Sequence, residues 1–205
     1  MHRSRENVTR KIPIVRKGSK YVAMARSHLR EAVPVVIAIR DMLNLAKTAK
    51  EVREMIKQKK LKVNGRMVVE LNESIQLFHI LEADKAYQLS LSPAGRFIFV
   101  ETKAKDRLAK ILGRSLISGG KIQIHLHDGT NIIGKKEHAV QDSLYLDISN
   151  KPVKHVAFGK GSKVFATAGK YIGQEGKIVS YEAGVCTVQF PEIKATIPAR
   201  MVVAQ

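Results

Sequence analysis

The cations between residues 48 and 60 have the clearest potential for chemistry in this sequence. Four of them recur at i, i+3, i+7 and i+10, which places them on one face of a helix: Lys50, Arg53, Lys57 and Lys60. The opposite face of that helix is apolar: Ala49, Val52, Met55 and Ile56. A helix that buries one face and exposes a row of cations on the other is suited to neutralising the phosphates of a nucleic acid.

The flanking residues predict how this helix begins and which elements come after it. Thr48 is a favourable N-cap, and Glu51 three residues later completes a capping box. Residues 61–63 alternate as a half-buried strand does, and Asn64-Gly65 is the preferred pair for a type I′ turn. We therefore predict a helix, a strand, a tight turn and a second strand. Three more cations lie close to this turn: Lys59, Lys62 and Arg66.

The composition of the whole chain points to the same class of partner. The 205 residues include 36 Lys and Arg against 18 Asp and Glu, which gives a formal net charge of +18 and a pI of about 10.1. Such a balance is typical of nucleic-acid binding proteins. A membrane-surface protein would concentrate its cations on one long amphipathic helix, whereas here they are spread over predicted strands, turns and a helix. Solubility alone is better served by acidic residues.

Cysteine usage and hydropathy narrow the class further. Cys186 is the single cysteine, which excludes an intrachain disulfide and a multi-cysteine zinc site. It lies in the alternating segment 184–190, where we expect a small core residue of a strand. The N-terminus lacks the pattern of a signal peptide, and the apolar run 32–39 is too short to span a bilayer. We therefore expect a cytoplasmic globular protein.

Changes of pattern along the chain predict an α+β protein with several domains. Residues 1–33 form a basic N-terminal arm, and residues 34–85 form an α+β module whose first helix covers Pro34–Leu45. Residues 86–158 form a central β-rich domain with a small antiparallel sheet or barrel. Residues 159–205 show about five short strands with glycine turns, which is the pattern of a small SH3-like barrel.

The basic arm is predicted to be structure-poor, because Pro13 and Gly18 break any early helix. Apolar residues are interleaved with its cations, so we expect it to order against an RNA partner and not to move freely in solvent. It has too few apolar residues to form a core alone. Its candidate RNA contacts are Arg10, Lys11, Arg16, Lys17 and Lys20.

Two segments resemble RNA-binding motifs of known families. Leu61-Lys-Val-Asn-Gly-Arg66 closely matches the end of the alpha-L RNA-binding motif, although Lys59 stands where that family usually has a glycine. The motif's usual arginine at the start of the second helix is also absent, since Thr48-Ala49 occupies that place. The resemblance therefore implies that the helix contact passes to Lys50 and Arg53, with Asn64 and Gly65 at the turn.

Segment 169–178, Gly-Lys-Tyr-Ile-Gly-Gln-Glu-Gly-Lys-Ile, resembles a KOW motif. Its characteristic glycine is matched by Gly176, where the absence of a Cβ would let the chain turn. The resemblance implies that Lys170 and Lys177 are exposed beside this turn for RNA binding.

The order of these parts resembles the archaeal and eukaryotic-type family of small-subunit ribosomal proteins numbered four. The resemblance includes segments 10–22, 28–34 and 119–129 as well as the two motifs, and the compact form is similar to archaeal members. It implies a structural protein of the small ribosomal subunit, with ribosomal RNA and neighbouring ribosomal proteins as partners. We expect the RNA contact of this chain to extend along the helix to Lys57 and Lys60. It would continue through Lys59, Lys62 and Arg66.

Catalytic and cofactor motifs are absent from the sequence. It contains neither a phosphate-binding loop nor a nucleophile elbow, so we expect no enzyme activity, no cofactor and no small-molecule substrate. His125 and His127 lie two apart on a predicted strand and would face the same way, but a metal site would need a third ligand. Two alternatives remain open: a KOW-containing transcription or RNA-chaperone factor, and an RNA-modifying enzyme anchored by the alpha-L motif.

Overall fold

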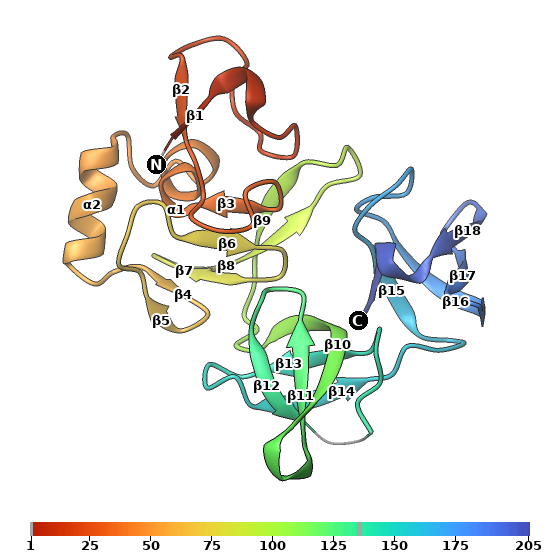
Figure 1. Cartoon of the computed structure of the whole chain (residues 1–205). Helices are drawn as coiled ribbons and strands as arrows, with labels where there is room; N and C mark the ends of the chain where they lie inside the picture. The colour runs from red at the N-terminus through yellow and green to blue at the C-terminus, as the bar shows by residue number, and fades with distance from the viewer. Residues whose placement is uncertain (1, 135–136) are drawn as a thin grey trace. The chain divides into compact units, whose positions relative to one another are not determined.

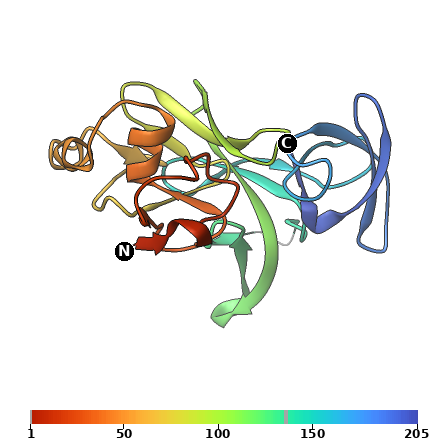
Figure 2. The ribbon, with the colours of Figure 1, turned by 90° about the horizontal axis from the view of Figure 1, so that it is seen from above.

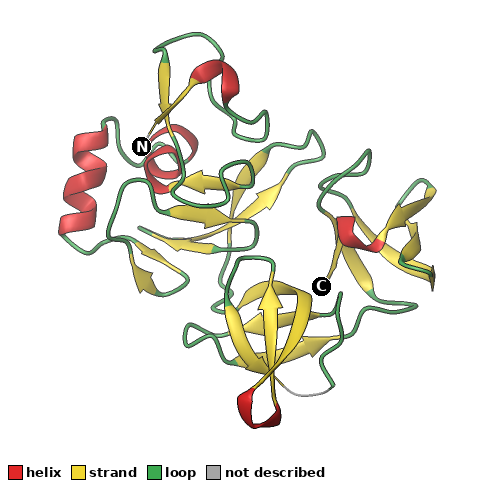
Figure 3. Cartoon of the chain, in the orientation of Figure 1, coloured by secondary structure: helices red, strands yellow, loops and turns green. Residues whose placement is uncertain are grey.

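The computed structural model describes residues 2–134 and 137–205. The chain divides into two compact units, Met1–Lys105 and Asp106–Gln205, coloured red to yellow-green and green to blue in Figure 1. Strands far outnumber helices (Figure 3), and the predicted α+β class is confirmed. Within the described residues, every helix falls short of the length and apolar character that crossing a membrane requires.

The first unit alternates short helices and strands. Its elements are β1 (His2–Ser4), η1 (Arg5–Asn7), β2 (Tyr21–Ala23), β3 (Ala32–Pro34), α1 (Val35–Ile37), η2 (Ala38–Met42), α2 (Ala49–Lys57), β4 (Lys62–Val63), β5 (Arg66–Met67), β6 (Ser74–Gln76), β7 (Ile80–Glu82), β8 (Ala86–Leu91) and β9 (Phe97–Glu101). Five strands form one antiparallel sheet in the order β5-β4-β7-β8-β9, while β1 pairs with β2 and β3 with β6. The largest fully buried side chains of this unit form its core: Ile37, Ile39, Leu61, Ile75, Leu81, Leu89 and Phe97.

The predicted domain boundary at residue 85 is wrong, because it cuts through this sheet. β8 pairs with β7, with Leu81 opposite Tyr87, and β9 pairs with β8, with Leu91 opposite Phe97. The two strands that come after residue 85 therefore belong to the first unit. A change of local pattern marks a new run of strands, but it does not reveal that those strands pair with earlier ones.

The N-terminal segment is folded in the structure, contrary to the structure-poor arm predicted from the sequence. β1 pairs with β2, and the side chains of Ile12, Val22 and Ala25 are buried. The backbone oxygen of Lys11 accepts a hydrogen bond from the N–H of Phe97 at 2.7 Å. A few apolar side chains suffice to order this segment, because they pack onto the first unit and need no core of their own.

The predicted helix over Pro34–Leu45 is shorter and of mixed geometry. Its first residue belongs to β3, a single α-helical turn comes next, and η2 continues as a π-helix. The N–H of Leu43 donates to the oxygen of Ala38 at 2.9 Å, the i to i+5 spacing of a π-helix. A π-helical segment of five residues is too short for its apolar spacing to differ visibly from that of an α-helix, so the sequence pattern does not distinguish the two.

The second unit is built from two five-stranded antiparallel sheets. Its elements are β10 (Arg107–Ile117), η3 (Ser118–Gly120), β11 (Lys121–Leu126), β12 (Asn131–Gly134), β13 (Ser143–Leu146), β14 (Pro152–Val156), β15 (Lys163–Ala166), β16 (Glu175–Glu182), β17 (Val185–Gln189), β18 (Lys194–Pro198), η4 (Ala199–Met201) and β19 (Val202–Ala204). The strand orders are β12-β11-β10-β13-β14 and β18-β17-β16-β15-β19. β10, the long curved green ribbon of Figure 2, shifts register between Ile111 and Gly113.

Each sheet of the second unit has its own apolar cluster. The first cluster includes Ile111, Ile124 and Leu144, all fully buried. The second includes Val188 and Cys186, and the thiol of Cys186 donates to the oxygen of Ile197 at 3.1 Å. The prediction that this cysteine is a small core residue is confirmed.

Candidate nucleic-acid interface

The predicted capping box at the start of α2 is present. The Thr48 hydroxyl accepts a hydrogen bond from the N–H of Glu51 at 3.2 Å. The Glu51 carboxylate in turn accepts from the N–H of Lys47 at 2.8 Å, one residue before the position that a standard capping box uses. The Lys47 bond, followed by a bond from the Thr48 hydroxyl, lowers the pKa of Glu51. The start of the helix, and with it the phase of its cationic face, is therefore fixed by two side chains.

The helix ends earlier than the predicted spacing of four cations assumes. Lys59 has φ +58°, and its N–H donates to Ile56 while that of Lys60 donates to Met55. These two bonds form a Schellman motif, in which the left-handed position is usually glycine. Lys60 therefore lies beyond α2, and the predicted face of four cations is a face of three.

The three remaining cations of α2 are exposed, whereas Val52 on the same helix is buried. In the described part of the chain, Lys50 and Arg53 form no ion pair with a carboxylate, whereas Lys57 forms an i to i+3 pair with Glu54 at 3.1 Å. We refer to Lys50, Arg53 and Lys57 as the α2 face.

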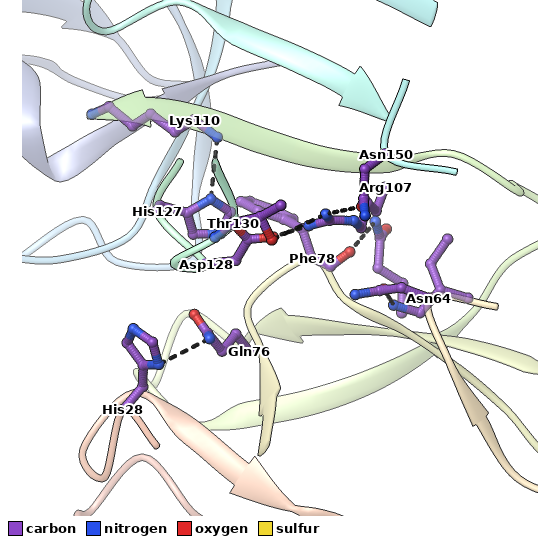
Figure 4. A network of polar contacts seen from close by, with 12 residues as sticks. His28, Asn64, Gln76, Phe78, Arg107, Lys110, His127, Asp128, Thr130 and Asn150 are labelled. Atoms are coloured by element: carbon purple, nitrogen blue, oxygen red, sulfur yellow. Dashed lines mark hydrogen bonds and ion pairs between the residues drawn. The ribbon is translucent and has the colours of Figure 1, made fainter. Parts of the chain in front are cut away.

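The predicted type I′ turn is present between β4 and β5. Asn64 and Gly65 have φ +51° and +76°, as that turn requires. The Asn64 side chain accepts a hydrogen bond from the N–H of Ile80 at 2.9 Å, so it holds the turn against β7 (Figure 4). Of the two cations in these strands, Lys62 is half-buried, whereas Arg66 is exposed and forms an ion pair with Glu73.

Most of the candidate cations of the N-terminal segment lie on its surface. Arg10, Arg16 and Lys17 are exposed. Lys11 is half-buried, with its ammonium 5.9 Å from the centre of the Phe97 ring. Lys20 is exposed and lies over the ring of the neighbouring Tyr21, at 5.5 Å.

Arg5, which is not among the candidates chosen from the sequence, anchors the loop that carries two of these cations. Its guanidinium donates to the backbone oxygens of Val15 and Ser19 and to the Ser19 hydroxyl. A Cβ on Gly18 would lie 3.2 Å from this guanidinium. The loop that presents Arg16 and Lys17 therefore closes around a side chain ten or more residues earlier, and no local pattern identifies such a contact.

In the second unit, Lys170 and Lys177 are exposed at the two ends of the predicted KOW segment. The Lys170 ammonium lies 5.8 Å from the centre of the Tyr171 ring, which stacks on Phe190 at 4.9 Å. Gly169 and Gly173, with φ +83° and +76°, form the turn here.

The role predicted for Gly176 is wrong in its physical cause. This glycine lies in β16 and not at the turn. A Cβ there would be 2.5 Å from Cγ1 of Val188 and 2.7 Å from the backbone oxygen of Gln189. Gly176 is therefore required by the close approach of β17, while other glycines make the turn.

His125 and His127 each have partners within the second unit. The His125 ring bonds to Ser115 at 2.9 Å and to Asn131 at 2.8 Å. Nδ1 of His127 accepts the backbone N–H of Lys110 at 3.1 Å. Among residues 2–134 and 137–205, no group of three His, Cys, Asp or Glu side chains has the arrangement of a metal site.

Two buried cations of the second unit were not predicted from the sequence. Arg107 forms a buried ion pair with Asp128 and donates to Asn150 at 2.6 Å (Figure 4). Burial lowers its pKa to about 10. Lys110 is 2% exposed, and its ammonium donates to the backbone oxygens of Ala199 at 2.8 Å and Val202 at 2.6 Å. The charged groups of Arg107 and Lys110 are hydrogen-bonded inside the protein. The exposed Lys and Arg side chains are therefore the ones that can bind a polyanion.

Comparison with known proteins identifies close similarity to one group of proteins. A profile described as "Ribosomal family S4e" matches residues 83–153. The small ribosomal subunit protein eS4 of Archaeoglobus fulgidus is 34% identical over 189 residues, which cover 89% of this chain and 80% of the relative. The eS4 of Methanocella arvoryzae is 31% identical over 185 residues, covering 86% and 79%. The crystal structure of the 30S ribosomal protein S4e from Thermoplasma acidophilum aligns with a TM-score of 0.74 at 25% identity, covering 85% of this chain and 94% of that one.

Proposed function

This chain belongs to the S4e family of ribosomal proteins and is a structural constituent of the small subunit of the cytoplasmic ribosome, and we propose that it holds ribosomal RNA through exposed Lys and Arg side chains. The observation that carries this proposal is the α2 face, where three exposed cations lie opposite a buried apolar side. Within the family role, the protein acts by binding and not by catalysis. We assign the alpha-L motif to the first unit and the SH3-like KOW barrel to the sheet β15–β19.

The α2 face suits a helical RNA partner. Lys50 and Lys57 are seven residues apart, which is about 10 Å along a helix axis. Double-helical RNA offers phosphates and 2′-hydroxyls at its surface, whereas its deep, narrow major groove is closed to side chains. A short row of cations on a rigid helix can therefore grip the backbone of RNA without reading its bases.

The other candidate residues extend this contact. In the first unit they flank the α2 face or lie on the N-terminal segment: Arg10, Lys11, Arg16, Lys17, Lys20, Lys59, Lys60, Lys62, Asn64, Gly65 and Arg66. We assign Asn64 a positioning role, because its side chain is bonded to β7, and we expect Arg66 to exchange Glu73 for phosphate. In the second unit, Lys170 and Lys177 form a separate contact. Neighbouring ribosomal proteins complete the set of partners.

Charge reversal on the α2 face tests this function. The triple variant Lys50→Glu, Arg53→Glu and Lys57→Glu should weaken binding to small-subunit ribosomal RNA at least tenfold. If each cation contacts one phosphate, the slope of log affinity against log salt should fall by about 2 to 3. Filter binding at several salt concentrations measures both quantities, and circular dichroism reports whether α2 still forms.

The matched control reverses the same amount of charge on exposed lysines outside the candidate set: Lys103, Lys105 and Lys194. Equal losses in the two triple variants would mean that binding is diffuse electrostatics with no defined site. Sedimentation of a cell extract provides the cellular counterpart. A protein that stays with small subunits through a high-salt wash supports the structural role, and a protein that is released contradicts it.

A further inference from the structure

The first unit contains a cavity whose lining includes just one of the candidate phosphate contacts described above, Lys17. It has a volume of about 480 Å³ and lies between the N-terminal segment and the helical turns α1 and η2. Ligand pockets usually enclose roughly 300 to 1,000 Å³. The cavity is therefore large enough for a small ligand and too small for a folded partner.

The lining of this cavity includes apolar side chains, which we call the floor, and polar side chains, which we call the wall. Val22 and Val36, both buried, contribute to the floor together with Leu71. Asp41 and Asn44 contribute to the polar wall. A pocket with apolar side chains and a few hydrogen-bonding groups can hold an extruded base, which buries its faces against the former and presents its edge to the latter.

The polar wall has unusual backbone geometry. It is carried by the π-helical turn η2, and Asn44 lies just beyond it with φ +55°. Neighbouring side chains do not face each other on an α-helix, yet Arg40 donates to both carboxylate oxygens of Asp41, at 2.9 and 2.7 Å. π-Helical turns and left-handed non-glycine residues are concentrated at functional sites.

The lining offers both kinds of charge that a nucleotide would meet: three cations (Arg5, Lys17 and Arg40) and one carboxylate (Asp41). Arg40 is neutralised by Asp41, and Arg5 is bonded to the loop 15–19 that forms one side of the cavity. Asp41 only accepts hydrogen bonds, and its oxygens retain lone pairs beyond those that Arg40 uses. Among the lining cations of the described residues, Lys17 is the one with neither an ion pair nor a side-chain hydrogen bond; it is exposed on the same loop and can meet a phosphate.

We propose that this cavity binds a single nucleotide extruded from ribosomal RNA. The base lies on Val22, Val36 and Leu71, its edge faces Asp41, and its phosphate meets Lys17. Guanine fits the wall best, because its two adjacent N–H donors match the fork with which Arg40 holds both Asp41 oxygens and can take the place of that fork. This inference rests on the proposed RNA-binding function and adds a specific, base-dependent contact to the phosphate contacts of the α2 face.

Three RNA hairpins of equal length test this inference: one fully paired, one with a single bulged G and one with a bulged U. The full-length wild-type protein should bind the G-bulged hairpin at least tenfold more tightly than the paired one, and the U-bulged hairpin should lie between them. Leu71→Phe, which fills the floor, should remove the preference for the bulge and leave affinity for paired RNA unchanged. Asp41→Asn should reduce the preference for G over U.

A second cavity variant covers the case in which Leu71→Phe does not fold. Asn44→Gly keeps the left-handed backbone, since glycine adopts positive φ freely, and it should lower affinity for the G-bulged hairpin alone. Equal binding of all three hairpins by folded wild-type protein would overturn the inference. It would leave the proposed function standing, because the α2 triple variant would still weaken paired and bulged RNA alike.

Free guanosine monophosphate distinguishes a nucleotide within RNA from a diffusible ligand. Methyl NMR signals of Val22, Val36 and Leu71 should shift only at millimolar nucleotide, because most of the binding free energy comes from the flanking duplex. Saturation of these signals at micromolar nucleotide, without any preference for the bulged hairpin, would overturn the assignment to ribosomal RNA.

Discussion

The ammonium nitrogen of Lys110 lies 2.6 Å from the backbone oxygen of Val202, although 92 residues separate them in the sequence. Lys110 is in β10 and Val202 begins β19, so this bond joins the two sheets of the second unit. A buried ammonium is costly unless it is hydrogen-bonded. Here the cost is offset by two carbonyl oxygens, those of Ala199 and Val202.

Burial of Lys110 should make the stability of the second unit depend on pH in the alkaline range. Burial lowers the pKa of this ammonium from its ordinary 10.5 to about 8. Between pH 8 and 10.5 the unfolded chain binds more protons at this position than the folded chain, so this group contributes stability that rises with pH. Below pH 8 both states are protonated, and the contribution of Lys110 is constant.

Lys110→Met isolates this contribution. Burial raises the pKa of the Cys186 thiol, which gives a slope of opposite sign, so the wild-type curve alone does not report on Lys110. The quantity to measure is the difference in unfolding free energy between wild type and variant, by urea denaturation at several pH values. That difference should increase in favour of the wild type from about pH 8 to about pH 10, and a constant difference would contradict the lowered pKa.

Asp128→Asn should be strongly destabilising. It leaves the buried guanidinium of Arg107 without its carboxylate, and breaking one partner of a buried ion pair typically costs about 3 to 5 kcal/mol. Urea denaturation measures the loss. Glu101→Gln is the matched control, because it breaks the exposed pair with Lys85 and should change the midpoint little. Equal effects of the two substitutions would show that the Arg107 pair carries no special weight.

Lys59→Gly should stabilise the first unit. Lys59 occupies the left-handed position of the Schellman motif, where a side chain other than glycine costs about 1 kcal/mol. The neighbouring Lys60→Gly removes the same charge at a position without positive φ and should not stabilise. Thermal unfolding of the two variants separates the backbone effect from the charge effect, and equal shifts in Tm would contradict this account.

Gly176→Ala should destabilise the second unit by about 1 to 3 kcal/mol, since the added methyl group overlaps Val188 and the backbone of β17. Gly159→Ala is the control, because a Cβ there has no heavy atom of the described residues within 4 Å. Thermal unfolding should show a lower Tm for the first variant and almost no change for the second. A tolerated Gly176→Ala would mean that β16 and β17 can separate at little cost.

Local features of the fold were predictable because they depend on neighbouring residues. The Thr48 cap and the Asn64-Gly65 turn are defined by side chains within a few positions, and both are present. The placement of β8 and β9 in the first sheet was not predictable, because strand pairing is decided by the tertiary fold. The folding of the N-terminal segment was missed for the same reason, since the core that it covers comes from later residues.

The candidate site shows the same division. The cations of the α2 face follow from helical spacing, and the structure leaves them exposed. The buried roles of Arg107 and Lys110 could not be predicted from the sequence, because the groups that their side chains bind lie between 21 and 92 residues away. The cavity near Asp41 depends on a π-helical turn, for which the sequence has no distinct pattern.

The bond between Lys110 and Val202 also constrains the order of events during translation. Lys110 leaves the exit tunnel about 90 residues before its carbonyl partners, which lie 89 and 92 positions later. Until then the ammonium stays hydrated, because the carbonyl oxygens that would offset the cost of burying it have not yet been synthesised. The first unit, whose strands all precede residue 105, can fold while the second waits. A nascent chain stalled before residue 199 should therefore hold a folded first unit and a protease-sensitive second one.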